Sequence, residues 1–422
     1  MRANKSVKKY RLIVGIDRSD KTLSITTLTR RGQLEQSEVS TKPDLLLAWW
    51  NQLRKEPRGK IAVAFEQPAI NLLNFFEDKG VTVYGLNPSS TWGYRQSLKV
   101  SRAHTDESDS KVIAQFVSTH QEQLKSYDYG SREARQLKGY CIARRRAVDQ
   151  RTGLTNRLQD LLKRYYPDAI SLMCPGIYRD INMDLLIKWP TPQSILAASE
   201  KELLSFFHAH GSRSLNRMEI RLKIIRSIEF LTEDSYLIEP VKNEVLCLCE
   251  QVLLLNRQVK DYDRRINDLI KSQEHSHLFE ALPGAGPALA PRIYSAFALY
   301  ADHCETAGDM ACLVGMAPVT EQSGNMHRVY RRLRCDHFLR QSFHEWAKES
   351  CKWSLWAKVY VRHKQEQGKP FHTIIRSLAV KWIRILFILW QKKESYDESK
   401  YINNLIRRDH FLAPKLKIMM QT

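Results

Sequence analysis

The sequence predicts an α/β domain at the N-terminus, followed by a longer and mostly helical remainder. Segments with strand and helix patterns alternate along residues 9–100. A sustained heptad-type seam of apolar residues begins at Val245, and helical periodicity returns from His277 to Trp390. We therefore expect an α/β plus α architecture, divided into segments 1–128, 129–275, 276–395 and 396–422.

The α/β prediction depends on five short strand patterns with helices between them. The expected strands are Leu12–Ile16, Thr22–Thr29, Gln33–Ser40, Ile61–Phe65 and Val81–Leu86. The expected helices are Leu45–Leu53 and Asn71–Lys79, the second closed by Gly80. A loop containing Trp92, Tyr94, Arg95 and Arg102 is expected to lead to a helix at Asp106. These elements predict a mixed sheet.

The middle of the chain predicts two long helices. The longer apolar seam consists of Val245, Leu248, Val252, Leu255, Val259, Tyr262, Ile266 and Leu269. A shorter apolar stripe consists of Leu154, Leu158, Leu161 and Tyr165. Such helices pair with each other or with another chain, and the pattern slightly favours pairing between chains. Residues 167–242 between them predict a helical insertion, broken at Trp189–Pro192 and Gly211. We expect this middle region to serve oligomerisation and nucleic-acid contact.

Composition indicates a polyanionic partner. The 422 residues include 66 Lys and Arg against 46 Asp and Glu, a formal net charge of +20, which favours nucleic acid. A membrane surface is the weaker alternative, because no apolar run approaches the roughly 20 residues of a spanning helix. The basic start MRANKSVKKYR lacks the apolar core of a signal peptide. Scattered single cysteines without metal-ligand spacing indicate a reducing, cytoplasmic location.

Four carboxylates suggest a metal site. Asp17 and Glu66 each end an apolar strand, where ligands gather in open α/β sheets. Asp106 and Asp109 stand three apart at a helix start, which places them on one face of its first turn. Acidic residues are also ordinary at helix N-termini. Four converging carboxylates need a divalent cation, and two-metal chemistry on a phosphodiester is the natural task in a basic protein.

Two glycine-containing turns stand out in the C-terminal part. LPGAG at 282–286 is similar to a helix-hairpin-helix turn, in which Gly284 and Gly286 would let the backbone bind a phosphate. A plain helix–helix turn is about as good an interpretation, and Pro287 and Pro291 predict a late start for the second helix. The second turn contains Ser323, a possible nucleophile. Arginines that could neutralise a phosphate follow it: Arg328, Arg331, Arg332, Arg334 and Arg340.

Together these segments resemble the DEDD insertion-sequence transposases, which include the Piv-type DNA invertases. The resemblance is carried by VGIDRSDKTLSITTL, AFEQPAINLLNFFEDKGVTVYGLNPSSTWGYRQS and SRAHTDESDSKVIAQF, and later by LFEALPGAGPALAPRI and LVGMAPVTEQSG. It implies an RNase H/RuvC-like domain whose Asp17, Glu66, Asp106 and Asp109 hold Mg²⁺. It also implies a separate transposase domain in which Ser323 becomes covalently joined to DNA.

The same resemblance implies partners. Members act on donor and target DNA as homo-oligomers, here a dimer or tetramer, with active sites assembled from different subunits. Several use a structured non-coding guide RNA that pairs with both DNAs, which delegates sequence reading to base pairing. Gln-Pro after Glu66, His104 in place of a lysine and Met316 in place of leucine depart from the family pattern. They leave the subgroup open.

The sequence therefore predicts a cytoplasmic DNA recombinase that moves its own insertion element and acts at the nucleoid. Two alternatives remain at this point. One is a RuvC-like nuclease that hydrolyses DNA with water. The other is a non-catalytic nucleic-acid-binding scaffold, in which the carboxylates are helix caps and strand ends.

Overall fold

The computed structural model describes residues 9–55, 59–66, 69–98, 106–324 and 326–420, and only the backbone of residues 106 and 107. The chain divides into two compact units, Met1–Tyr129 and Gly130–Thr422. In these described ranges no helix is long and apolar enough to cross a membrane.

The first unit is built on a five-stranded mixed sheet in the order β3-β2-β1-β4-β5. The central strand β1 pairs antiparallel with β2 and parallel with β4, which is in turn parallel to β5. The strands are β1 (Leu12–Arg18), β2 (Thr22–Thr29), β3 (Leu34–Ser40), β4 (Ile61–Glu66) and β5 (Thr82–Leu86). The mixed α/β sheet expected from the sequence is confirmed.

Helices cover both faces of this sheet. On one face, α1 (Pro43–Arg54) and α2 (Ile70–Phe76) contribute Trp50 and Phe76 to a core with the β1, β2 and β4 side chains. On the other face, α4 (Asp106–His120) packs against the sheet through Ile113 and Val117. Alternate side chains of β1 and β4 therefore belong to two different cores.

The prediction of a loop after β5 is wrong, because Pro88–Leu98 forms helix α3. Asn87 begins this helix: its side-chain Oδ1 accepts a hydrogen bond of 3.0 Å from the Ser89 backbone N–H. Pro88 follows in the first turn, where a missing N–H leaves no helical bond unmade. The Asn-Pro pair thus starts a helix as well as ending a strand.

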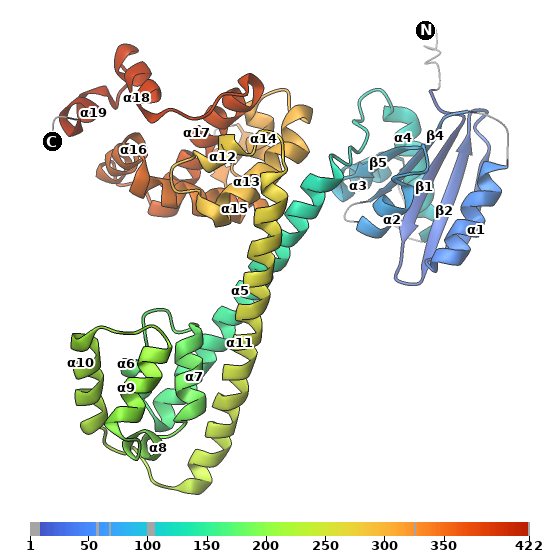
Figure 1. Ribbon diagram of the computed structural model, residues 1–422. Coiled ribbons are helices and arrows are strands. Elements are labelled where there is room, and N and C mark those ends of the chain that lie inside the picture. The colour runs from blue at the N-terminus through green and yellow to red at the C-terminus, as the bar shows by residue number, and fades with distance from the viewer. Residues whose placement is uncertain (1–8, 56–58, 67–68, 99–105, 325, 421–422) are drawn as a thin grey trace. The chain divides into compact units, whose positions relative to one another are not determined.

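Two long helices pair within the second unit, α5 (Arg132–Tyr165) and α11 (Ser235–Lys271) (Figure 1). The seam residues Val245 and Val252 share a core with Leu158 of α5, and Leu255 and Val259 share one with Ala147. The seam is therefore buried inside one chain. The structure thus pairs these residues within one chain, whereas the sequence slightly favoured pairing between chains.

The insertion between the long helices is helical, as expected. It comprises α6 (Asp168–Leu172), α7 (Asp180–Lys188), α8 (Pro192–Leu196), α9 (Glu200–Ala209) and α10 (Leu215–Arg226). Trp189, Phe206 and Phe207 join the core that these helices share with α5 and α11. This core makes the insertion a packed part of the second unit.

The C-terminal part is helical around a tryptophan-rich core that includes Trp346, Trp356 and Trp382. Its helices are α12 (His277–Glu280), α13 (Gly286–Tyr300), the 3-10 turn η1 (Ala301–His303), α14 (Ala307–Leu313), α15 (His337–Trp353), α16 (Leu355–Glu366), α17 (Phe371–Lys392), α18 (Glu398–Arg407) and α19 (Ala413–Met419). The prediction of a late start for α13 is wrong: Pro287 lies in its first turn, where proline is tolerated. The sequence did not predict α19 or the hairpin of β6 (Val319–Ser323) and β7 (Met326–Tyr330).

Candidate functional site

Two of the predicted carboxylates lie at the same edge of the first unit's sheet. β1 and β4 run parallel with Ile16 opposite Phe65, so Asp17 and Glu66 each follow one residue later at the same level. Ile16 and Phe65 belong to the core under α1 and α2. By strand alternation, Asp17 and Glu66 point to the opposite face, which α4 covers. Both are half-buried.

A glycine lets the start of α4 approach this face. A Cβ atom on Gly15 would lie 2.6 Å from the backbone nitrogen of Ala114, closer than real Cβ contacts allow. The Ser110 hydroxyl fixes the same contact by hydrogen bonds of 2.8 Å to Thr26 and 3.2 Å to Ser24. Because Ser24 lies opposite Asp17 in the β1–β2 register, the first turn of α4 is brought to the strand-end carboxylates.

Helix α3 contributes polar partners that the sequence analysis missed. The Thr91 hydroxyl donates a hydrogen bond to Glu66, and Arg95 forms an ion pair with Asp109. Ser108 donates to Asp109 as well, at 2.9 Å. The available signal was Asn87-Pro88, which is typical of a helix start and would have put Thr91 and Arg95 one turn apart on one face.

We call Asp17, Glu66 and Asp109 together the carboxylate edge. Its donor chemistry suits a hard divalent cation, since oxygen ligands are what Mg²⁺ prefers. Among the side chains that the structure describes, no three His, Cys, Asp or Glu residues lie close enough to hold a metal ion. The fourth predicted ligand, Asp106, begins α4, but its side chain lies outside the described residues. The four-carboxylate metal site therefore stays a prediction.

The predicted nucleophile lies in the second unit, on the β6–β7 hairpin. Ser323 is the last residue of β6 and pairs with Met326 of β7. Gly324 follows with φ +53°, in the left-handed region that favours glycine. We call residues 319–330 the serine hairpin. Ser323 is exposed, and so is nearly every other residue of this hairpin that the structure describes. The hydroxyl is therefore accessible at the tip of a two-stranded ribbon.

The serine hairpin is fixed at its base. A Cβ on Gly315 would lie 2.9 Å from the Cβ of Cys335, so the segments before and after the hairpin touch. The Arg332 Nε donates to the Ala317 carbonyl at 3.3 Å, and Arg340 donates to the Arg332 carbonyl at 3.2 Å. Arg332, which the sequence analysis predicted to bind nucleic acid, therefore also stabilises the base of the hairpin through its hydrogen bond to Ala317.

The other predicted arginines follow the exposed ribbon. Arg328 lies on β7 and donates to the Tyr330 hydroxyl at 3.4 Å. Arg331 and Arg334 follow directly after the strand and are exposed. These positions suit phosphate contact near Ser323 because guanidinium groups bind phosphate oxygens in a fork.

The LPGAG turn packs against helix α15. Gly284 has φ +73°, and a Cβ there would lie 2.8 Å from the carbonyl carbon of Glu349. The Trp346 indole N–H donates to the Pro283 carbonyl at 3.1 Å. Gly284 therefore has a packing role, whereas Gly286, with φ +53°, has open space around it. Phosphate binding by this turn stays a prediction.

Two family models match this chain. One, described as a transposase of the DEDD IS110 type, matches residues 14–167, and one for transposases of the IS116/IS110/IS902 family matches residues 276–362. The first match contains the carboxylate edge and Asp106, and the second contains Ser323. Residues 168–275 lie between the two matches.

Proteins of insertion elements are similar along most of the chain. A protein of the IS117 mini-circle from Streptomyces coelicolor is 24% identical over 329 residues, covering 77% of this chain and 80% of the relative. The 44.8 kDa protein of IS116 from Streptomyces clavuligerus is 22% identical and covers 69% and 72%. The 43.6 kDa protein of IS110 from Streptomyces coelicolor is 21% identical and covers 80% and 84%.

Proposed function

The chain belongs to the IS110/IS116/IS902 family of insertion-sequence transposases, and from this premise we propose that it recombines DNA by attack of Ser323. The observation that supports this proposal is the exposed serine at the tip of a hairpin followed by arginines. Family membership implies a DNA-processing enzyme with DNA as substrate. We further propose that Ser323 attacks the DNA, that a guide RNA selects the DNA, and that the protein acts as a homo-oligomer.

In the first step Ser323 Oγ attacks a DNA phosphorus. An Oγ–P bond forms while the bond from phosphorus to the leaving oxygen breaks. The proton that Ser323 loses is balanced by the proton that the leaving oxygen gains as it becomes a free hydroxyl. In the second step a hydroxyl of the exchanged strand displaces Ser323, which regains its proton. The number of phosphodiester bonds is conserved, so ATP is not needed.

The arginines of the hairpin region favour this step electrostatically. Attack places additional negative charge on the phosphate oxygens, and guanidinium groups stabilise that charge when they are already in position. Arg328, Arg331 and Arg334 are exposed close to Ser323 in sequence. His327, which lies opposite Gln322 in the hairpin, is a candidate to accept the Ser323 proton.

The carboxylate edge and Asp106 would hold Mg²⁺, which when bound supplies Lewis-acid stabilisation of the phosphate charge. Without it, these carboxylates repel one another, and the α3 contacts reduce that repulsion: Arg95 compensates Asp109, and Thr91 donates to Glu66. These two side chains keep the carboxylates in place.

The proposed partners follow the family resemblance. Donor and target DNA bind through the basic surface of the chain, and a structured non-coding RNA selects them by base pairing. The protein acts as a homo-oligomer, a dimer or tetramer, in the cytoplasm at the nucleoid. Strand exchange in a purified system with and without the RNA encoded beside the gene would test the guide.

Covalent trapping tests the serine. Wild-type protein is mixed with labelled element-end DNA and denatured, and DNA-linked protein is measured. We expect Ser323→Ala to give no adduct and to lower strand exchange by at least about a thousandfold, while DNA binding survives. Thr320→Ala is the matched control, because it removes an exposed hydroxyl group from the same strand, and it should behave as wild type. Adducts from Ser323→Ala would remove Ser323 from the mechanism.

Substitution of Asp106 tests the carboxylates. Asp106→Asn keeps the size of the side chain but removes its charge, so we expect strand exchange to be abolished at any Mg²⁺ concentration. Asp20→Asn, at an exposed position beyond β1, is the matched control. Normal recombination by Asp106→Asn in Mg²⁺ would exclude it as a ligand.

The same trapping experiment separates the alternatives. A nuclease that uses water would cut strands without protein-linked DNA, and it is the candidate that the carboxylate edge favours by itself. A scaffold would give neither cut strands nor adducts.

A further inference from the structure

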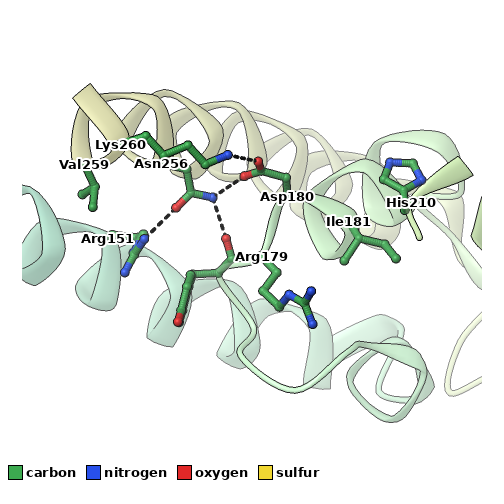
Figure 2. Close-up of a pocket in the computed structure, with 9 residues that line it drawn as sticks. Arg151, Arg179, Asp180, Ile181, His210, Asn256, Val259 and Lys260 are labelled. Atoms are coloured by element: carbon green, nitrogen blue, oxygen red, sulfur yellow. Dashed lines mark hydrogen bonds and ion pairs between the residues drawn. The ribbon is translucent and has the colours of Figure 1, made fainter. Parts of the chain in front are cut away.

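The second unit contains a pocket where the insertion meets the paired long helices (Figure 2). Its cavity volume is about 370 Å³, and it is lined by residues from α5, α11 and the start of α7, together with His210 at the end of α9. Neither family-model match extends past residue 167 into the insertion, and the second begins only at residue 276. The cavity is large enough for a small organic ligand. The proposed strand-exchange chemistry assigns nothing to it.

One buried amide organises the pocket. Asn256 of α11 is 4% exposed. Its oxygen accepts a hydrogen bond of 2.8 Å from Arg151, and its nitrogen donates to the Tyr178 carbonyl and to Asp180, both at 2.7 Å. Figure 2 shows Asn256 between Arg151 and Asp180. Lys260 of the same helix donates to Asp180 at 2.7 Å. The pocket wall is thus tied together across three elements.

The pocket has more positive than negative charge. Arg151, Arg179 and Lys260 line it against the single carboxylate of Asp180, which Lys260 already neutralises. Among the described residues, Arg151 and Arg179 form no ion pair. Partial burial, with the positive charge of Arg144, lowers the pKa of Arg151, although Tyr178, Asp180 and Asp263 oppose this. An anion in the pocket would compensate these two charges.

The positive charge is local to the pocket. Residues 167–242 contain nine Lys and Arg against ten Asp and Glu, so the insertion as a whole is not basic. A broad electrostatic surface for a DNA duplex is therefore not indicated here. A small ligand with one phosphate group fits better.

An aromatic ring lies beside these cations. The Arg151 guanidinium lies 3.9 Å from the centre of the Tyr178 ring, whose side chain is 44% exposed. Ile181 and Val259 add apolar surface to the lining. The Arg151 guanidinium supports one side of the Tyr178 ring, and Ile181 and Val259 form an apolar wall beside it. This arrangement suits a planar base that stacks on the ring.

We propose that this pocket binds one nucleotide unit, with its phosphate held by Arg151, Arg179 and Lys260 and its base against Tyr178. The proposal rests on the proposed function only in that the protein meets nucleic acid. The nucleotide comes either from a single-stranded segment of nucleic acid or from the free pool, because both present the same phosphate and base. Such a site would let the insertion hold an unpaired nucleotide at the paired long helices.

Photo-crosslinking with the full-length protein tests the site. Short single-stranded oligonucleotides containing 5-iodouracil, in RNA and DNA versions, are irradiated with the protein, and mass spectrometry locates the adduct. We expect the adduct on Tyr178. 5-Iodouridine monophosphate is a second probe: labelling by it identifies a site for free nucleotides, and labelling by the oligonucleotides alone identifies a unit within a chain. No adduct on Tyr178 from any of these probes overturns the proposal.

Matched charge variants complete the test. The pair Arg179→Gln and Lys260→Gln removes two exposed cations of the pocket and should lower the Tyr178 adduct about tenfold. The pair Arg213→Gln and Arg217→Gln removes the same charge from exposed positions of the insertion outside the pocket and should leave the adduct unchanged. Equal adduct in both double variants overturns the proposal. Ser323→Ala should label as wild type, so failure of strand exchange and failure of this site are distinguishable.

Discussion

The carboxylate edge and the serine hairpin differ in how much of the protein holds them. Asp17, Glu66 and Asp109 are half-buried on strands and a helix that pack on each other, and α3 adds an ion pair and a hydrogen bond. Ser323 is exposed on a two-stranded ribbon that is tied to the rest of the unit at its base. A metal-binding group needs fixed neighbours, whereas a nucleophile that must reach DNA needs access. Changes at the first region should therefore alter stability and activity together, and changes at the second should alter activity alone.

Gly15→Val should have the largest effect. The new side chain would meet the α4 backbone at Ala114, so α4 must move off the sheet or the sheet must distort. We expect a loss of about 3 kcal/mol in the free energy of unfolding, with strand exchange abolished. Urea unfolding, with hydrogen exchange of the α4 amides, measures it.

Gly324→Ala is the counterpart on the serine hairpin. No described residue beyond its chain neighbours lies within 4 Å of a Cβ at this position, although its φ of +53° strains any other residue. We expect a cost of about 1 kcal/mol confined to the hairpin, with the urea midpoint of both units nearly unchanged. If Gly15→Val were as stable as Gly324→Ala, α4 would not be packed on β1 as described.

Apolar patterns made much of this arrangement predictable. The strands of the sheet bury a face, so their composition identifies them, and the carboxylates that follow Ile16 and Phe65 could be found as strand ends. The seam of α11 was equally plain. Its partner was not, because the same apolar stripe fits α5 of one chain or a helix of another.

The missed hairpin and helix α3 lack a buried apolar face. Strands β6 and β7 are almost entirely exposed, so VTEQS and MHRVY carry no alternating pattern. Helix α3 has Thr91 as its one buried residue and hence no apolar stripe. The roles of Thr91 and Arg95 were missed because a loop was expected where α3 forms, and it is the helix that places them beside Glu66 and Asp109.

Gly284→Ala should have an intermediate effect and separates packing from phosphate binding in the LPGAG turn. A methyl group would press on the Glu349 backbone at a strained φ of +73°, so we expect a loss of about 2 kcal/mol in unfolding free energy. In Gly286→Ala the new methyl group has open space and only the positive φ is unfavourable, so we expect a loss of about 1 kcal/mol in unfolding free energy. Urea unfolding measures both. Equal losses would mean that the turn does not rest on α15.

The smallest expected effect is a pH dependence of the second unit's stability. His344 of α15 stacks on His372 of α17, with ring centres 5.4 Å apart. Partial burial, and then the positive charges of His372 and Arg376, lower the pKa of His344 below 6.5, while Glu345 opposes this and Lys348 adds to it. Protonation is therefore less favourable in the folded protein than in the unfolded chain.

Because the unfolded chain takes up a proton near pH 6.5 and folded His344 does so only at lower pH, the unfolded state binds more protons in between. Stability from this group is complete above that range and is lost as the pH falls through it. We expect Tm to fall by a few degrees on acidification, and His344→Gln to reduce that fall. His327→Gln, on the exposed serine hairpin, should leave it unchanged. A larger change from His327→Gln would mean that the hairpin, and not the packed helices, controls the stability of the second unit.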